Sequence, residues 1–304
     1  SSVTPHSSAT RPRPLLTLAS DFGTPYPAAM RGVIRRRTDA DLLDVSHELP
    51  RGDPLGAAFW LRFVLPEFPP AVHCAVVDPG VGTNRDAIAV RAGAHVILAP
   101  DNGLALPPAR ALVTDSKDDV DAPDSSSAID VYRVDGFDPA SATFHGRDVF
   151  APAAADIVEA IAQPDERNAD HTPELTEALE DLDWLTHVDD AVDLEIPEPT
   201  RHSAADSLAV DGEVLVVDDF GNAITNIPGA VVEDADRDRI RVNDAVVSVA
   251  ETFADVDPGA KLVTVGSHGY VECDVNDGDG AAAFELSPGD VVRIREVRAG
   301  GSDV

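Results

Sequence analysis

Short apolar runs alternate with amphipathic stretches through the first part of this 304-residue chain, as far as residue 190. Continuous apolar runs of about six residues are typical of strands that are buried on both faces of a sheet. The predicted strands are 15–20, 42–47, 73–78, 87–92, 95–100 and 129–134. Apolar positions with helical spacing predict helices at 28–37, 54–65, 148–163 and 173–182. This alternation predicts an α/β N-terminal domain with a largely parallel central sheet.

The pattern changes after residue 206, where short alternating runs are separated by Gly, Asp and Asn turns. The runs are 208–217, 223–227, 239–242, 245–249, 261–265, 270–275, 281–286 and 290–297. Such spacing is typical of an all-β sandwich or a small barrel. We therefore expect four parts, which are a disordered tail at 1–14, the α/β domain at 15–190, a linker at 191–206 and an all-β, barrel-like domain at 207–304.

The chain is strongly acidic, with 55 acidic and 23 basic residues and a formal net charge of −32. Only two of the basic residues are lysines, Lys117 and Lys261. This charge disfavours nucleic acid and anionic membranes as partners, and it destabilises the fold by self-repulsion at low salt. At molar ionic strength the Debye length falls to about 3 Å and the repulsion is screened. The composition is typical of a halophile that accumulates salt, with an ordinary acidic protein as the alternative.

The two cysteines, Cys74 and Cys273, each lie within an apolar run, so we expect buried thiols and neither a disulfide nor a zinc site. The first 14 residues contain no apolar segment of the kind found in secretion signals. No stretch approaches the ~20 apolar residues of a membrane span. These features predict a soluble, cytoplasmic protein without membrane partners.

Two loops carry residues that together can activate a water molecule. In VVDPGVGTNR, Asp78 follows an apolar run and precedes a Pro-Gly-Val-Gly turn and Arg85. In TFHGRDVFAP, His145 comes directly before a helical pattern. An acid, a guanidinium and an imidazole at the ends of strands and helices form a hydrolytic constellation. Taken singly, Asp78 could cap its turn, Arg85 could form a surface ion pair and His145 could cap the helix.

Three further loops have the chemistry of a nucleoside site. Asp21 in LASDFG can accept hydrogen bonds from both hydroxyls of a vicinal diol, and its alternative role is to cap the following helix. Asn222 in DDFGNAITN carries an amide that both donates and accepts, which suits an adenine edge or an amino acid head group. Ser267 lies between glycines in GSHG, where the backbone can approach a ligand closely. Turn formation is the alternative interpretation of the last two motifs.

Six sequence blocks occur in the order SDFG, VVDPGVGTNR, APDNG, TFHGRDVFAP, DDFGNAITN and GSHGYVECDVNDG. In this order they resemble the S-adenosyl-L-methionine hydroxide adenosyltransferase family, whose members hydrolyse S-adenosylmethionine (SAM) to adenosine and methionine. The resemblance extends from about Leu15 to Val292. It implies an N-terminal α/β domain joined to a C-terminal β-barrel, with SAM as the substrate and with neither a cofactor nor a metal.

By this resemblance, Asp78, Arg85 and His145 form the water-activating triad of the family. The related SAM-dependent fluorinase has a tyrosine where Asp78 stands and a halide-contacting serine where Gly146 stands. This chain therefore follows the hydrolase pattern at both positions. The fluorinase also has an arginine where His268 stands, which leaves the binding of the methionine carboxylate open.

The resemblance also implies the substrate contacts and the assembly. Asp21 is expected to bind the ribose diol, and Phe144 is expected to lie against the substrate. The residues implied to hold the methionine and adenine ends are Asp218, Asn222 and Ser267, with Phe253 as a stacking candidate. Family members are usually trimers, with each site shared between the N-terminal domain of one subunit and the C-terminal domain of its neighbour.

Three alternative functions remain open at this point. The same scaffold could transfer a halide and act as a chlorinase-like halogenase. A non-catalytic adenosine or SAM sensor would bind without turnover. A metal-dependent phosphohydrolase could use Asp21, Asp78 and Asp101, although the sequence has no Gly-Lys loop to cradle a phosphate.

Overall fold

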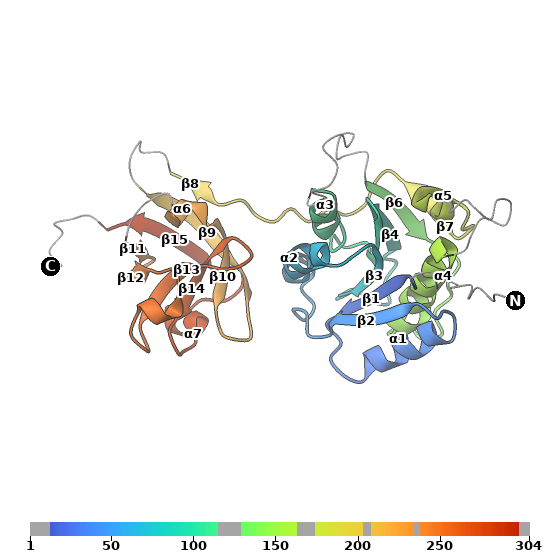
Figure 1. The fold of residues 1–304 in the computed structure, drawn as a ribbon, viewed down its shortest axis with the longest axis horizontal. Coiled ribbons are helices and arrows are strands. Elements are labelled where there is room, and N and C mark those ends of the chain that lie inside the picture. Colours follow the sequence, from blue (N-terminus) through green and yellow to red (C-terminus); the bar gives the residue numbers. More distant parts are fainter. Residues whose placement is uncertain (1–12, 115–128, 163–173, 203–207, 234–237, 298–304) are drawn as a thin grey trace, which may run out of the picture. The chain divides into compact units, whose positions relative to one another are not determined.

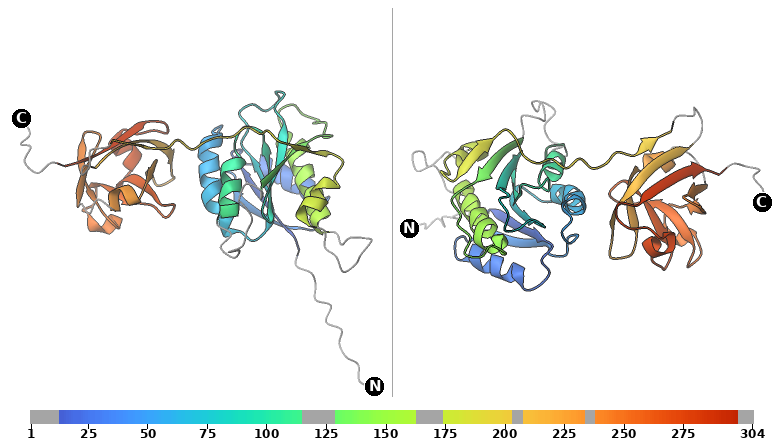
Figure 2. Two further views of the ribbon diagram at one scale, coloured as in Figure 1. Left: turned by 90° about the horizontal axis from the view of Figure 1, so that it is seen from above. Right: turned by 180° about the vertical axis from the view of Figure 1, so that it is seen from behind.

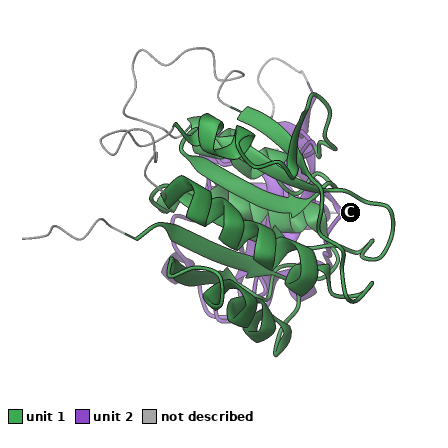
Figure 3. Cartoon of the chain, turned by 90° about the vertical axis from the view of Figure 1, so that its right-hand side faces the viewer, with its two compact units in different colours: residues 1–194 green, residues 195–304 purple. Residues whose placement is uncertain are grey.

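The computed structural model describes residues 13–114, 129–162, 174–202, 208–233 and 238–297. It contains two compact units, residues 1–194 and residues 195–304 (Figure 3), and the division falls inside the stretch predicted as a linker. The predicted disordered tail at 1–14 lies almost wholly outside the described residues. None of the helices in the described ranges is long and apolar enough to cross a membrane.

Unit 1 is built around a seven-stranded sheet with the order β2-β1-β3-β5-β4-β6-β7 (Figure 1). Its strands are β1 (Leu15–Ser20), β2 (Asp41–Ser46), β3 (Ala71–Val76), β4 (Ala87–Ala92), β5 (His95–Pro100), β6 (Ile129–Val134) and β7 (Leu185–Val188). The pairings β1–β2, β1–β3 and β3–β5 are parallel, whereas β4–β5, β4–β6 and β6–β7 are antiparallel. The predicted α/β class is confirmed, but the sheet is mixed and its parallel part is limited to β2-β1-β3-β5.

The antiparallel half begins with one short connection. Only Gly93 and Ala94 separate β4 from β5, and Ala92 pairs directly with His95. A parallel pair needs a crossover of about a dozen residues or more, so a connection this short forces a hairpin. Gly93 has a φ of 58°, the left-handed conformation that glycine adopts without steric cost.

Helices cover both faces of this sheet (Figure 2). The helices α1 (Tyr26–Arg35), α4 (Ala151–Ala162) and α5 (Leu175–Glu180) pack on one face, and α2 (Pro54–Val64) and α3 (Leu106–Thr114) pack on the other. Neighbouring residues of β3 enter different cores, with Cys74 in the first and Ala75 in the second. Burial on both faces explains why these strands are continuous apolar runs in the sequence.

The helix α3 is absent from the predicted elements. It begins with Leu106, Pro107 and Pro108, and consecutive prolines are a common signal for a loop. Proline is nevertheless tolerated in the first turn of a helix, because the N–H groups there have no intrahelical partner. Ala109 and Leu112 are buried in the second core, which holds the helix in place.

Unit 2 is a closed barrel with the strand order β10-β14-β13-β12-β11-β15-β9, and the pairing of β10 with β9 closes it. The strands are β9 (Ala209–Val217), β10 (Ala223–Pro228), β11 (Arg239–Val242), β12 (Ala245–Val249), β13 (Lys261–Val265), β14 (Tyr270–Val275) and β15 (Val291–Glu296). A short helix, α6 (Ala230–Glu233), follows β10. Outside the barrel, β8 (Thr200–Arg201) pairs with β9 from within the predicted linker. Of the two predicted all-β architectures, the structure is therefore the barrel.

One predicted strand of unit 2 is wrong. Residues 281–286 lie in and just after the helix α7 (Gly280–Phe284). Asp279 caps this helix, and its side chain accepts a 2.7 Å hydrogen bond from the backbone N–H of Ala282. Alanine has the highest helix propensity, so consecutive alanines after a capping aspartate favour a short helix over a strand.

Both cysteines are buried and free, as predicted. Burial raises the pKa of the Cys74 thiol to about 12. Burial, together with nearby carboxylates, also raises the pKa of Cys273. These thiols therefore stay protonated and act as core residues.

A stacked histidine pair lies near the start of β3 and β5. The Nδ1 atom of His73 lies 2.8 Å from Thr17 Oγ1, and its Nε2 atom lies 3.0 Å from His95 Nδ1. His73 is 1% exposed, and burial, with a smaller repulsion from His95, lowers the pKa of His73 to about 3. His73 is therefore neutral in the folded protein at neutral pH.

We expect His73 to make the fold acid-sensitive. The unfolded chain binds a proton near pH 6.5 and the folded chain only near pH 3, so the free energy of unfolding falls as the pH drops through this window. Between pH 7 and pH 4 the loss is about 3 kcal/mol. Chemical denaturation of wild type, His73→Gln and the exposed-site control His187→Gln at both pH values measures this loss. Equal losses in wild type and His73→Gln would contradict the expectation.

Candidate functional site

The predicted acids of unit 1 gather at one edge of the sheet, where β1 and β3 end. Asp21 directly follows β1, and Asp78 lies just beyond the end of β3. The strands β1 and β3 are parallel neighbours. Ligands bind at this edge of a parallel sheet because the loops that follow the strands converge there.

Asp78 is held by two contacts to one of its carboxylate oxygens. Its Oδ1 atom lies 3.2 Å from Arg85 Nη1 and accepts a 2.9 Å hydrogen bond from the backbone N–H of Gly80. The side chain of Asp78 is 8% exposed. Gly80 lies against the guanidinium, since a Cβ at this position would come within 2.4 Å of Arg85 Nη2. Asp78 therefore both caps its turn and forms an ion pair with Arg85 in which the carboxylate is mostly buried.

The loop that carries His145 packs against the loop that carries Asp78. A Cβ at Gly82 would lie 2.7 Å from the carbonyl oxygen of Ala142, shortly before His145 in the chain. Asp148 holds this second loop, and its Oδ2 accepts a 2.8 Å hydrogen bond from a backbone N–H of the same loop. His145 occupies the N-cap position of the π-helical turn that begins at position 146, but its side chain forms no capping hydrogen bond.

Phe144 belongs to an aromatic cluster beside His145. Its ring meets the rings of Phe22 and Tyr26 edge to face, with centroid separations of 6.1 and 5.3 Å. The guanidinium carbon of Arg147 lies 5.1 Å from the centroid of the Phe144 ring. These contacts fix the ring and, with it, the backbone that presents His145.

Asp21 links two turns at the same edge. Its Oδ2 atom accepts a 2.8 Å hydrogen bond from the backbone N–H of Gly52. A Cβ at Gly52 would lie 3.8 Å from the Cβ of Pro79, so the Gly52 turn neighbours the turn that follows Asp78. The N-cap residue of α1 is Pro25 and no side chain caps that helix. The alternative role of Asp21 as a helix cap is therefore excluded.

A polar network next to Asp21 was not predicted from the sequence. His47, just beyond β2, places its Nδ1 atom 2.8 Å from Ser20 Oγ and its Nε2 atom 3.1 Å from Asp44 Oδ1. Arg31 of α1 donates a 2.5 Å hydrogen bond to Asp44. Burial raises the pKa of Asp44, but hydrogen bonds from Arg31 and His47 outweigh it and keep this pKa below its usual value. The network joins the ends of β1 and β2, and an Asp and a His three positions apart in DVSH were its only signal.

In unit 2, Asp218 and Asn222 form one hydrogen-bonded turn between β9 and β10. Asp218 Oδ1 accepts 2.9 Å hydrogen bonds from the backbone N–H groups of Phe220 and Asn222. Its Oδ2 accepts a 3.1 Å hydrogen bond from Asn222 Nδ2. Phe220, which was not among the predicted site residues, is 83% exposed at the tip of this turn. The turn therefore combines a fixed amide with an exposed aromatic ring.

The other two predicted residues of unit 2 lie on separate loops of the barrel. Ser267 is exposed in the turn between β13 and β14. Beside it, His268 Nδ1 accepts a 3.1 Å hydrogen bond from the backbone N–H of Tyr270, and its Nε2 lies 2.8 Å from Glu272 Oε1. His268 is thus held by Glu272. Phe253 is 39% exposed and begins a short 3₁₀ turn.

Comparison with known proteins decides the family. The family model of the SAM hydroxide adenosyltransferase N-terminal domain matches residues 16–166, and that of the C-terminal domain matches residues 212–293. The chain is 37% identical over 288 residues to the (R)-S-adenosyl-L-methionine hydrolase of Salinispora tropica, which covers 93% of this chain and 98% of the relative. This chain belongs to the SAM hydroxide adenosyltransferase family.

Further relatives agree with this chain in length and fold. The (R)-S-adenosyl-L-methionine hydrolase of Thermus thermophilus is 36% identical over 292 residues, with 93% of this chain and 99% of the relative covered. The crystal structure of an uncharacterized conserved protein from Thermotoga maritima aligns with a TM-score of 0.68 and 30% identity, covering 92% of this chain and 99% of that chain. Both units therefore belong to one conserved arrangement of domains along the chain.

Gly146, where the hydroxide adenosyltransferase pattern differs from the fluorinase pattern, is tightly packed. A Cβ at this position would lie 2.8 Å from Phe22 Cε2 and 3.1 Å from Met30 Sδ. Contacts this short require the neighbouring ring and thioether to move. The packing around residue 146 therefore favours glycine over serine.

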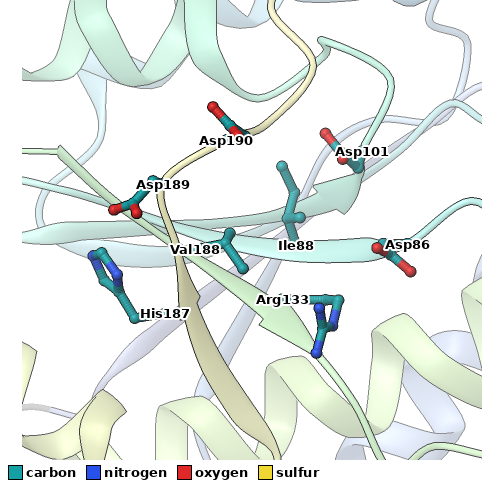
Figure 4. A pocket seen from close by; sticks show the side chains of 8 residues that line it. All are labelled: Asp86, Ile88, Asp101, Arg133, His187, Val188, Asp189 and Asp190. Atoms are coloured by element: carbon teal, nitrogen blue, oxygen red, sulfur yellow. The ribbon is translucent and has the colours of Figure 1, made fainter.

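A hollow of about 370 Å³ lies on unit 1 (Figure 4). It is lined by Asp86, Ile88, Asp101, Arg133, His187, Val188, Asp189 and Asp190. Asp101 Oδ1 accepts a 2.7 Å hydrogen bond from the backbone N–H of Val192, which gives this carboxylate a structural role. Among the described residues no group of three or more His, Cys, Asp or Glu side chains is arranged to hold a metal ion. The geometry thus gives no support to a phosphohydrolase that combines Asp101 with Asp21 and Asp78.

Proposed function

We propose that this chain hydrolyses S-adenosyl-L-methionine to adenosine and L-methionine. The observation that carries the proposal is the Asp78–Arg85 pair at the end of β3, on a loop that packs against the loop of His145. Relatives 36% and 37% identical over 93% of the chain carry the name (R)-S-adenosyl-L-methionine hydrolase, which supports the same substrate here. SAM is the substrate in this proposal, and no cofactor or metal takes part.

In the proposed mechanism a water molecule attacks C5′ of the ribose in line with the carbon–sulfur bond. Asp78 orients this water or accepts its proton, and His145 is the second partner. Arg85 pairs with the Asp78 carboxylate and stabilises the developing hydroxide. The bonding electrons pass to the sulfonium, so methionine leaves as a neutral thioether and needs no general acid.

The substrate contacts are divided between the two units. The proposed binding residues are Asp21, Phe144, Asp218, Asn222, Phe253 and Ser267. Asp21 uses Oδ2 to hold Gly52, and in this proposal Oδ1 accepts hydrogen bonds from the ribose diol. Asn222 recognises the adenine edge or the amino acid group, and the exposed ring of Phe220 on the same turn offers a stacking surface.

We further propose a cytoplasmic homotrimer in which the binding residues of unit 2 serve a neighbouring subunit. Support comes from the division of the implied site residues between unit 1 and unit 2. The net charge of −32 supports a salt-rich cytoplasm, because that charge needs screening. Sedimentation velocity in molar KCl tests the assembly, and a mass near that of a single 32.0 kDa chain would contradict it.

Halide transfer is the alternative that the packing at Gly146 disfavours. We expect Gly146→Ser to lose about 1–3 kcal/mol of stability through overpacking and to form no halogenated product. The matched control is Gly32→Ser, because a Cβ at Gly32 has no atom within 4 Å. Thermal unfolding and product analysis in chloride compare the two variants. A Gly146→Ser protein that is as stable as its control and makes 5′-chloro-5′-deoxyadenosine would contradict this account.

Product analysis tests the proposed activity itself. The purified protein is incubated with SAM of both sulfonium configurations in molar KCl, and the products are separated by HPLC. Adenosine and methionine in equal amounts are the expected result, with the same rate after dialysis against EDTA. Binding without turnover would instead identify a sensor, and a rate lost on EDTA treatment would point to a metal-dependent hydrolase.

A further inference from the structure

Asp274 is a buried acid of unit 2 that the proposed mechanism does not use. It lies in β14 and is 0% exposed. Neither of its carboxylate oxygens has a hydrogen-bond partner among the described residues. A buried polar group without a partner costs free energy, and such groups are rare outside functional regions. The burial of this carboxyl group without a partner therefore needs an explanation.

Strand register places Asp274 beside the substrate-binding turn. Ala223 pairs with Cys273 across β10 and β14, so Asn222, the residue before Ala223, lies opposite Asp274. Cys273 belongs to the barrel core, and neighbouring residues of a strand point to opposite faces. Asp274 therefore points away from the core, on the face that it shares with Glu272.

The helix α7 lies beside β14 (Figure 1). A Cβ at Gly280 would lie 2.7 Å from the Cα of Asp274. The backbone N–H of Ala281 donates a 2.8 Å hydrogen bond to the carbonyl oxygen of Gly221, which lies in the turn. The backbone of Asp274 thus packs against α7, and α7 in turn is hydrogen-bonded to the turn that lies opposite Asp274.

The groups that face Asp274 are mostly acidic. Burial, with smaller contributions from Glu272 and Asp218, raises the pKa of Asp274 to about 8. Asp279 on α7 is a further acid, whose side chain caps its own helix. At neutral pH Asp274 therefore keeps its proton, which avoids a third negative charge between Asp218 and Glu272.

The basic side chains of the neighbouring elements have other partners. His268, in the turn before β14, is 2.8 Å from Glu272. Lys261 of β13 pairs with Val275, and directly paired residues share a face of the sheet. Its side chain therefore leaves on the face opposite to Asp274, where its Nζ lies 4.7 Å from the centroid of the Phe284 ring.

We propose that Asp274 is a positioning residue that supports the Asp218–Asn222 turn as a neutral acid, and that its ionisation displaces this turn and weakens substrate binding. The physical cause is repulsion, because three ionised carboxylates at Asp218, Glu272 and Asp274 are unstable in a site with little water. The turn is the part that moves, since its tip is exposed. The proton goes to solvent, and no bond of the substrate is made or broken. This inference rests on the proposed role of Asp218 and Asn222 in binding SAM.

The pH dependence of KM tests this proposal. For wild type we expect KM for SAM to be level from pH 6.5 to 7.5 and to rise above about pH 8, approaching tenfold per pH unit, while kcat lacks this transition. Asp274→Asn has nearly the same shape and is neutral at every pH, so its KM is expected to stay at the wild-type neutral value throughout. Asp257→Asn, at an exposed acid of the same unit, is the matched control and keeps the wild-type profile.

Each other outcome is decisive. A level wild-type KM overturns the proposal whether or not the variant folds. A rise in KM that persists in Asp274→Asn, or a KM raised at all pH values in that variant, overturns it too. If SAM is not turned over at all, calorimetric titration with SAM replaces KM. An affinity that falls above about pH 8 without turnover would refute the hydrolase function and leave the role of Asp274 standing.

Discussion

Asp78→Asn is expected to lower kcat for SAM hydrolysis by about 10²–10⁴-fold, which is the contribution of a positioned acid–base group. Asparagine has nearly the same shape, and its Oδ1 can still accept the hydrogen bond from Gly80. It cannot take a proton from water or pair with the charge of Arg85. The affinity for SAM should change little, because Asp78 acts on the water and not on the nucleoside. HPLC measures kcat, and calorimetric titration with SAM measures the affinity.

The matched control for this variant is Asp86→Asn. Asp86 directly follows Arg85 in the chain, and it lines the hollow of unit 1, whose lining does not include Asp78 (Figure 4). Its replacement removes one negative charge near the same loop and should leave kcat unchanged. Turnover in Asp78→Asn close to that of the control would remove Asp78 from the mechanism. A similar loss of kcat in both variants would show that kcat depends on the total negative charge near the loop and not on Asp78 itself.

Asp21→Ala is expected to weaken the binding of adenosine by about 10- to 100-fold. Hydrogen bonds to a charged group contribute about 1.5–3 kcal/mol, and the variant removes those from the ribose diol. The same change leaves the Gly52 N–H without its 2.8 Å acceptor, so part of the loss comes from the turn. A comparison of adenosine with 2′-deoxyadenosine separates the two effects.

In this comparison wild type is expected to bind 2′-deoxyadenosine much more weakly than adenosine. Asp21→Ala should bind both nucleosides with similar, low affinity, because the partner of the 2′-hydroxyl is gone. Calorimetric titration of the four combinations measures this coupling. An unchanged preference for adenosine in Asp21→Ala would show that the only role of Asp21 is to hold the Gly52 turn and that other residues bind the diol.

Six strands of the sheet of unit 1 could be predicted from their apolar runs, but the short edge strand β7 and the pairing directions could not. The two-residue connection at Gly93 and Ala94 was the signal for a hairpin. It marks where the parallel half ends. In unit 2 the run at 281–286 has the composition of a strand or of a helix, and the capping contact of Asp279 decides for the helix. The pattern of apolar residues identifies the buried segments. Helix capping then decides between helix and strand, and the length of the connection decides between parallel and antiparallel pairing.

The candidate site could be predicted where a functional side chain comes directly after the end of a strand. Asp21 and Asp78 both follow strands that are parallel neighbours, so their convergence follows from a general rule of α/β sheets. His47 and Asp274 could not be found in this way. The role of His47 depends on the pairing of β1 with β2, and that of Asp274 depends on the pairing of β10 with β14. Such partners are distant in sequence, and the DVSH motif alone does not reveal that His47 contacts Ser20.

The most direct test of the central claim is hydrolysis of SAM in water enriched in ¹⁸O, followed by mass spectrometry of both products. The account predicts one ¹⁸O atom in adenosine, at the 5′-hydroxyl, and none in methionine, because water attacks C5′ and the sulfonium only accepts the bonding electrons. Asp78→Asn should form the same labelled product at the strongly reduced rate. Adenosine without label, label in methionine, or a 5′-chloro product would contradict the account.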